Sequence, residues 1–173
     1  ILSFITDIKL NPHFNTVLFV PLPYLFFANG KITIGAQNVS SFKEGSYTGE
    51  VGASMLLEAG AKYCLVGHSE RRTLFGETDV QIKQKLQLLK RSGIIPVLCV
   101  GESLKDRKSK LHLEVVRKQM ENYEEGMIVA YEPVWSIGTG LIPTTEEIVE
   151  MATFIQENYN TEILYGGSVN EEN

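Results

Sequence analysis

The sequence has few of the features that mark secreted, membrane or nucleic-acid-binding proteins. It contains only two cysteines, Cys64 and Cys99, each inside an apolar run and without the spacing of a disulfide framework. This usage predicts a reducing compartment, the cytoplasm. No apolar run approaches the roughly 20 residues that span a bilayer. Acidic residues outnumber basic ones, 21 to 16, and the longest mixed basic stretch, Lys105–Lys110, is expected to be a solvated loop or helix start. We therefore expect no nucleic-acid partner and no membrane partner.

The rest of the composition is that of an ordinary soluble globular protein. Hydrophobic residues are 43% and charged residues 21% of the 173 residues, and this length favours one domain spanning residues 1–173. The partly apolar start, Ile1–Leu10, lacks the basic flank and cleavage site of a signal peptide and is expected to be the end of a helix. Because the chain starts at Ile1 and not at Met, we expect that it does not begin at a native start.

Short β-branched runs alternate with longer amphipathic segments along the chain. Several of the runs are apolar on both faces, as are the strands of a parallel sheet covered by helices. From the second run onward, their starts fall about 31 to 36 residues apart, which is the length of one βαβ unit. The sequence therefore predicts an α/β fold. The predicted strands are Val17–Val20, Ile32–Ala36, Tyr63–Gly67, Ile94–Val100, Met127–Tyr131 and Ile163–Tyr165, and the predicted helices are Gly49–Ala59, Asp79–Ser92, Lys110–Glu121 and Thr144–Asn158.

Several residues predict where helices begin or end. Gly60 and Gly93 fall where C-terminal caps belong. Either Thr144 or Thr145 can cap the start of the last predicted helix. The link from Tyr24 to Gly30 is too short for a full helical crossover.

The segment Gly67–Arg72, with the sequence GHSERR, follows the third predicted strand directly. An apolar strand that ends in Gly-His places the imidazole of His68 at the strand's carboxyl end, where active sites of α/β proteins lie. The free N–H groups of the following helical turn would favour a neutral imidazole that donates a hydrogen bond. The alternative is a structural histidine beside a surface salt-bridge cluster. His13 and His112 have no such context and are expected to be surface residues.

A second motif, Tyr131–Gly140, follows the fifth predicted strand. Glu132 is a carboxylate between an apolar strand and a proline, and a partly desolvated carboxylate is a good candidate base. The following segment, Pro133–Gly140, combines a rigid proline, a large aromatic residue and a Gly-x-Gly end. This composition suits a lid that excludes water, and the backbone N–H of Gly138 could approach a phosphate. The alternative is an ordinary loop with a structural salt bridge.

A third motif follows the sixth predicted strand. Two adjacent glycines precede Ser168 and lead into a helix start, so Gly166, Gly167 and Ser168 could form a phosphate-binding nest. The alternative is a simple Gly-Gly turn.

Taken together, the motifs resemble the triosephosphate isomerase family. The resemblance runs in order through essentially all 173 residues, and it implies a (βα)8 TIM barrel in which the six visible strands are strands 2 to 7 of eight. The matching segments are Gly67–Arg72, Tyr131–Gly140, Tyr165–Val169, Gly35–Asn38, Thr48–Glu50 and Cys99–Glu102.

The resemblance also implies an activity and residue roles. A triose-phosphate isomerase interconverts dihydroxyacetone phosphate and D-glyceraldehyde 3-phosphate in glycolysis and gluconeogenesis. Glu132 would be the base that moves a proton between C1 and C2, and His68 would polarise the carbonyl. Ser69 and Glu70 would support the histidine. Phosphate would bind at Gly138 and Ser168, and no metal or organic cofactor is implied.

The sequence departs from the family pattern at both ends. It has no Asn-x-Lys motif of strand 1 and no Gly-Gly phosphate loop of strand 8, and its 173 residues compare with about 250 in a typical barrel of this kind. Omitted segments of a full enzyme would explain this, and so would a real truncation, whose open strand edges should cause aggregation or require a partner. We favour omission, because several intervals beside loops also look short.

Two other functions remain open at this point. One is a non-catalytic truncated fragment or interaction protein that keeps the fold, and the other is a related barrel enzyme that acts on a different phosphorylated sugar. The Glu132–Gly140 match argues against the second.

The resemblance further implies a homodimer joined through the loop Gln37–Gly52, where Phe42 and Tyr47 would be unfavourably exposed in an isolated chain. The alternative is that both rings fold back on their own subunit.

Overall fold

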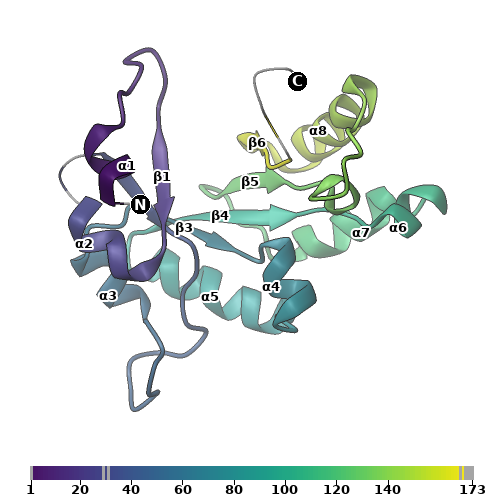
Figure 1. The fold of residues 1–173 in the computed structure, drawn as a ribbon. Coiled ribbons are helices and arrows are strands. Elements are labelled where there is room, and N and C mark those ends of the chain that lie inside the picture. Colours follow the sequence, from purple (N-terminus) through teal and green to yellow (C-terminus); the bar gives the residue numbers. More distant parts are fainter. Residues whose placement is uncertain (1, 29, 31, 168, 170–173) are drawn as a thin grey trace. The chain divides into compact units, whose positions relative to one another are not determined.

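The computed structural model describes residues 2–28, 30, 32–167 and 169 of the chain (Figure 1). The chain separates into two compact units, of which unit 1 comprises Ile1–Val66 and Val80–Pro96, and unit 2 comprises Gly67–Asp79 and Val97–Asn173. No helix in the described ranges is long and apolar enough to cross a membrane.

The strands of unit 1 are parallel and follow chain order. They are β1 (Val17–Val20), β2 (Thr33–Ala36) and β3 (Tyr63–Val66). In the register of the sheet, Val17 lies beside Thr33 and Gly35 lies beside Tyr63. β4 (Ile95–Val100) begins in this unit, where the amide of Ile95 donates to the carbonyl of Lys62 at 2.9 Å.

The helices of unit 1 lie before, between and after these strands, and two of them fall in the segments predicted as Gly49–Ala59 and Asp79–Ser92. They are α1 (Leu2–Asp7), α2 (Leu25–Ala28), α3 (Ala53–Glu58) and α5 (Asp79–Arg91), and the 3-10 turn η1 (Leu22–Tyr24) leads into the single turn of α2. The apolar side chains of α5 recur at helical spacing, so Ile82, Leu86 and Leu89 form one buried stripe. The short η1–α2 connection confirms that the link after Tyr24 is too short for a full crossover.

The predicted start of one helix in unit 1 is wrong. The helix predicted from Gly49 begins only at Ala53, because Gly49 has a φ of +91°, which is incompatible with a right-handed helix. Gly52 precedes the first helical residue. By contrast, Gly60 and Gly93 follow α3 and α5 with positive φ values, as predicted for residues that end helices.

The strands of unit 2 are also parallel and follow chain order. β4 ends here and pairs with β5 (Ile128–Tyr131), which pairs with β6 (Ile163–Tyr165). Val97 lies beside Ile128, and Val129 lies beside Ile163. The helices are α4 (Ser69–Leu74), α6 (Leu104–Lys108), α7 (His112–Gln119) and α8 (Thr145–Tyr159), with 3-10 turns η2 (Met120–Asn122) and η3 (Val134–Ser136).

Capping residues set the helix ends of unit 2. Thr144 caps α8, since its side chain accepts from the amide of Glu147 and the carboxylate of Glu147 accepts from the amide of Thr144. The helix predicted for Lys110–Glu121 is too long at its start, because Lys110 has a φ of +58° and α7 begins at His112. Its end tightens into the 3-10 turn η2.

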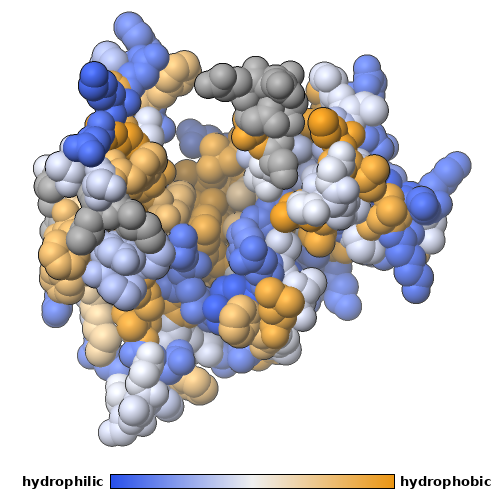
Figure 2. All heavy atoms as spheres, in the orientation of Figure 1, coloured by the Kyte–Doolittle hydropathy of each residue, from blue (hydrophilic) through white to orange (hydrophobic). Residues whose placement is uncertain are grey.

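Each unit has a buried apolar core and some exposed apolar side chains. In unit 1, large exposed side chains on α1 and α2 include Phe4, Phe26 and Phe27, which are 56%, 72% and 59% exposed. Apolar spheres are visible over this part of the chain in Figure 2. In unit 2, buried residues of α8 include Met151 and Ile155, and this helix packs against β6 (Figure 1).

Candidate active site

Glu132 is held at the carboxyl ends of three neighbouring strands of unit 2. Its amide donates to the carbonyl of Val100 at 2.7 Å, and the amide of Gly166 donates to the carbonyl of Tyr131 at 2.7 Å. A Cβ on Gly101 would collide with the carbonyl oxygen of Glu132, and a Cβ on Gly166 would lie 2.8 Å from its Cγ. The two glycines therefore permit a close approach that no other residue allows.

His68 is oriented by the helix that it precedes. It occupies the N-cap of α4, and its Nδ1 accepts a hydrogen bond from the amide of Glu70 at 3.3 Å. An imidazole nitrogen that accepts an N–H carries no proton, so the neutral ring has its proton on Nε2. The carboxylate of Glu70 lies farther away, at 3.9 Å from Nδ1, and its side chain is exposed.

The protonated nitrogen of His68 points at the carboxylate of Glu132. Nε2 lies 3.2 Å from Oε1 of Glu132, and the backbone N–H of Ser69 donates to Oε2 at 3.0 Å. The Glu132 side chain is only 6% exposed, whereas that of His68 is 30% exposed. A buried carboxylate can take up a proton, and the partly open imidazole beside it can donate a hydrogen bond to a neighbouring oxygen, as acid–base catalysis requires.

The structure brings together four of the six predicted site residues. The contacts above connect His68, Glu132, Ser69 and Glu70. Ser69 was predicted to support the histidine, but its backbone N–H binds Glu132 instead. Gly138 lies farther along the predicted lid in an exposed turn with a φ of +68°. The predicted phosphate residue Ser168 lies outside the described residues.

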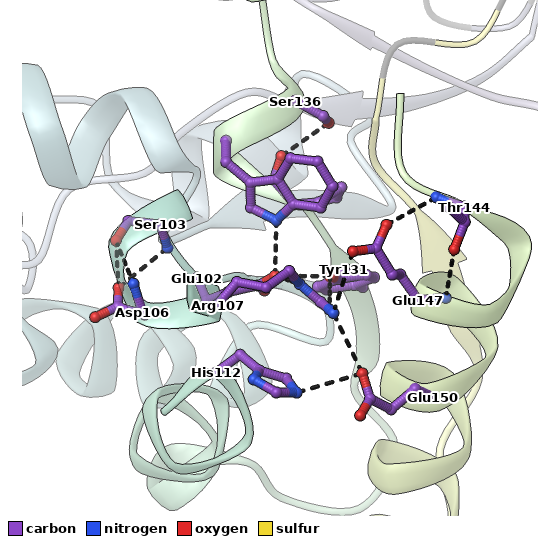
Figure 3. Close-up of polar contacts among 12 residues, drawn as sticks. Glu102, Ser103, Asp106, Arg107, His112, Tyr131, Ser136, Thr144, Glu147 and Glu150 are labelled. Carbon is purple, nitrogen blue, oxygen red and sulfur yellow. Dashed lines mark hydrogen bonds and ion pairs between the residues drawn. The ribbon is translucent and has the colours of Figure 1, made fainter. Parts of the chain in front are cut away.

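A buried polar cluster follows the strand ends beside Glu132 (Figure 3). Glu102 is fully buried, and its Oε1 accepts hydrogen bonds from Arg107 Nε at 2.8 Å, Trp135 Nε1 at 2.8 Å and the Tyr131 hydroxyl at 3.1 Å. Since Tyr131 precedes Glu132 and Trp135 lies in the segment after it, this carboxylate ties down the chain on both sides of the candidate base.

The electrostatics of this cluster favour a neutral tyrosine and a permanently charged arginine. Burial raises the pKa of Tyr131 above its ordinary range, and the nearby Glu102 carboxylate raises it further. Burial alone would lower the pKa of Arg107, but its hydrogen bonds to Glu102 and Tyr131 outweigh that effect and raise the pKa. Tyr131 therefore remains a hydrogen-bond donor across the physiological pH range.

The cluster extends outward to two glutamates and a histidine. Arg107 also lies 3.2 Å from Glu150 and 3.7 Å from Glu147, and His112 Nε2 lies 3.3 Å from Glu150 (Figure 3). The side chains of Arg107 and His112 are each only 12% exposed. The stretch Lys105–Lys110 does begin within a helix, α6, as one of the two predicted alternatives, but Arg107 is not solvated. The predicted surface position of His112 is also wrong. Both side chains turn toward buried or shared carboxylates.

Sequence reasoning missed the role of Glu102. A usable signal was present, because Glu102 follows an apolar strand and a glycine, just as Glu132 directly follows the next strand along the chain.

Among the residues that the structure describes, no group of three or more His, Cys, Asp or Glu side chains is placed to hold a metal ion.

Replacing Glu102 by alanine should destabilise the protein strongly. The change leaves Arg107 without its closest buried partner and removes an acceptor from Tyr131 and Trp135, so we expect a loss of about 3 to 5 kcal/mol in the free energy of unfolding. Urea unfolding measures this loss. As a control, Glu150→Gln alters an exposed partner of the same arginine and should cost less than about 1 kcal/mol. Equal effects of the two changes would contradict a central role for Glu102.

The chain is similar to known proteins along nearly its whole length. Residues 3–173 match the sequence profile of the family described as Triosephosphate isomerase. A triosephosphate isomerase of Mesomycoplasma hyorhinis is 45% identical over 150 residues, which cover 83% of this chain and 62% of the relative. One from Azoarcus sp. (strain BH72) is 41% identical over 177 residues, covering 91% of this chain and 73% of the relative.

A solved structure has the same fold. The crystal structure of triosephosphate isomerase from Bartonella henselae superposes with a TM-score of 0.79 at 35% identity, covering 88% of this chain and 70% of that chain. The chain therefore spans between about three fifths and three quarters of the length of these proteins. Its six described parallel strands belong to the eight-stranded α/β barrel class.

The matched profile, the similar relatives and the shared fold, together with a glutamate and a histidine that meet at the strand ends, lead to one assignment. The chain belongs to the triosephosphate isomerase family.

Proposed function

We propose that this protein interconverts dihydroxyacetone phosphate and D-glyceraldehyde 3-phosphate by proton transfer through an enediolate, as a single-domain cytoplasmic enzyme of glycolysis and gluconeogenesis. The observation that carries the proposal is the 3.2 Å contact between Nε2 of His68 and Oε1 of Glu132 at the carboxyl ends of parallel strands. A glutamate base with a neutral histidine is the known arrangement for this reaction.

The reaction requires the two side chains to exchange partners. The 3.2 Å separation leaves no room for substrate atoms between Glu132 and His68, so substrate must replace this contact. The Nε2–H of His68 then donates to the substrate carbonyl oxygen. Glu132 removes a proton from C1, and negative charge moves onto the C2 oxygen. His68 gives its Nε2 proton to that oxygen and takes up the proton of the C1 hydroxyl. Glu132 then returns its proton to C2, so that C1 becomes the aldehyde.

The segment after Glu132 would close over the substrate. The hydroxyl of Ser136 donates to the carbonyl of Pro133 at 2.9 Å, and the hydroxyl of Thr139 donates to the carbonyl of Trp135 at 2.8 Å, so each half of the lid is internally braced. These contacts support movement of the lid as a unit. In the proposal, the backbone of Gly138 and the residue Ser168 bind the phosphate, and exclusion of water limits phosphate loss from the enediolate.

An isotope experiment tests the proposed activity. The 173-residue chain is incubated with dihydroxyacetone phosphate in D2O. We expect deuterium at C2 of the glyceraldehyde 3-phosphate that forms and at C1 of the recovered dihydroxyacetone phosphate, because a proton held on a carboxyl group can exchange with solvent. Glu132→Gln supplies the matched background. Activity no higher than this background would support the non-catalytic alternative.

The intact mass of the natural protein distinguishes a fragment from a longer enzyme. A mass near 19.3 kDa indicates a fragment, and a clearly larger mass indicates a longer enzyme.

We also propose a homodimer joined through the loop Gln37–Gly52. Its base is closed by a hydrogen bond from the amide of Ser40 to the carbonyl of Val51 at 2.9 Å. Phe42 and Tyr47 stack on each other with ring centroids 4.4 Å apart, yet they remain 48% and 45% exposed. A stacked and half-exposed aromatic pair supports a docking surface, because such apolar area gains free energy when a partner covers it.

The pair of changes Tyr47→Asp and Thr48→Arg should dissociate the dimer. A charge in place of the stacked ring and a bulky cation at the exposed tip both oppose docking, and we expect activity to fall with the dimer if each loop supports the partner's active site. Sedimentation and the isomerase assay are measured on the same samples. A matched control is Lys43→Gln in the same loop. An unchanged dimer would contradict the interface, and an active monomer would contradict the coupling.

A further inference from the structure

Arg72 connects three parts of unit 2 around the candidate histidine. Its Nε–H donates to the carbonyl of Gly67 at 2.8 Å, one terminal nitrogen donates to Asp79 at 2.8 Å, and the other approaches the carbonyl of Cys99 at 3.5 Å. The side chain is only 18% exposed. These contacts join Gly67, Asp79 and Cys99, all within unit 2, through one guanidinium group.

The contact to Gly67 acts directly on the backbone of His68. The Gly67 carbonyl belongs to the peptide group that leads into His68, and Gly67 has a φ of +73° where the strand turns into α4. Rotation of this peptide would move the imidazole relative to Glu132. Since a displacement of about an ångström can cost about 10²-fold in rate, a hydrogen bond that holds this peptide has a catalytic consequence.

Arginine is suited to this task in a way that lysine is not. The planar guanidinium presents its donors in a fixed fork, so one side chain can satisfy acceptors in three directions at once. A lysine ammonium has the same charge, but its flexible stem cannot hold the carbonyls of Gly67 and Cys99 and the carboxylate of Asp79 in this fixed arrangement.

We propose that Arg72 is a positioning residue for His68, holding the Gly67–His68 peptide so that the Nε2–H of the imidazole points to the reacting oxygen. The inference rests on the proposed isomerase function. In this proposal, Arg72 does not contact the substrate. The neighbouring Arg71 has different partners, because it lies 3.3 Å from Glu77 and over the ring of Phe75.

The test compares Arg72→Lys with Asp79→Asn. The lysine variant keeps the charge but loses the fork, whereas the asparagine variant weakens the ion pair and leaves the Gly67 contact in place. For Arg72→Lys we expect kcat to fall by about 10- to 100-fold with KM within about twofold, because the lost alignment matters in the transition state. Asp79→Asn should keep kcat within about threefold.

A second readout does not depend on activity. In the unaltered chain, the 15N signals of His68 should show a neutral ring protonated on Nε2, since Nδ1 accepts from the amide of Glu70. In Arg72→Lys these signals should move toward values averaged over both tautomers, and in Asp79→Asn they should not. If the lysine variant fails to fold, slow solvent exchange of the Arg72 Nε–H in the unaltered chain tests the Gly67 contact itself.

The outcomes separate this inference from the proposed function. Changed His68 signals in Arg72→Lys alone would support positioning even if the unaltered chain shows no isomerase activity, in which case only the proposed function fails. Unchanged His68 signals with unchanged kcat would overturn the inference, and so would fast exchange of the Arg72 Nε–H. A raised KM with normal kcat would also overturn it, because it would point to substrate binding.

Discussion

The change Glu132→Asp is expected to lower kcat by about 10²-fold or more while the protein remains folded. Aspartate keeps the negative charge but withdraws the carboxylate by about one ångström, and a base misplaced by that distance loses its alignment with the substrate carbon. Hydrogen bonds of 2.7 Å to Val100 and from Gly166 fix the peptide group that joins Tyr131 to Glu132, so the main chain cannot easily move to compensate for the shorter side chain.

Steady-state kinetics and circular dichroism, measured together, check this expectation. The Glu132 side chain is buried and accepts from the amide of Ser69, so a modest loss of stability is also expected and is measured by urea unfolding. Glu146→Asp is the matched control, because Glu146 is an exposed residue in the first turn of α8 and should keep full activity. Full activity of the Glu132 variant would remove this residue from the role of base.

The change His68→Gln should reduce turnover more than substrate affinity. Glutamine can donate a neutral hydrogen bond, but it cannot exchange a proton with the enediolate, and general acid–base catalysis contributes about 10²- to 10⁴-fold. We expect kcat to fall within that range while KM changes by less than about threefold, since the interaction strengthens as charge develops on the substrate oxygen.

Kinetics across a range of substrate concentrations separate these effects for His68→Gln. His13→Gln is the control, because His13 is exposed and its amide contacts the side chain of Asn11, outside the candidate site. A raised KM with a normal kcat would show that His68 only binds substrate. Because Nε2 of His68 and Oε1 of Glu132 lie 3.2 Å apart, the double variant should lose much less than the product of the two single effects.

Strand positions were largely predictable because their signal is local. Val17–Val20 and Ile163–Tyr165 form strands with the predicted bounds. Three of the other predicted strands begin one residue later in the structure, and the strand predicted as Tyr63–Gly67 ends one residue earlier. Short apolar β-branched runs are favoured in covered parallel strands whatever lies far away in the sequence. Helix starts were less predictable, since the left-handed backbone at Gly49 and Lys110 depends on how each loop closes.

The sequence by itself determined the α/β class, the positions of the strands along the chain, and the placement of His68 and Glu132 directly after strand ends, since each of these follows from short segments. Only the tertiary structure decided that the amide of Ser69 binds Glu132, 63 residues away along the chain, and that Arg107 and Trp135 share the carboxylate of Glu102. Such contacts depend on sheet register and on the rotamers of packed side chains, and no local pattern encodes a distance between residues that far apart in sequence.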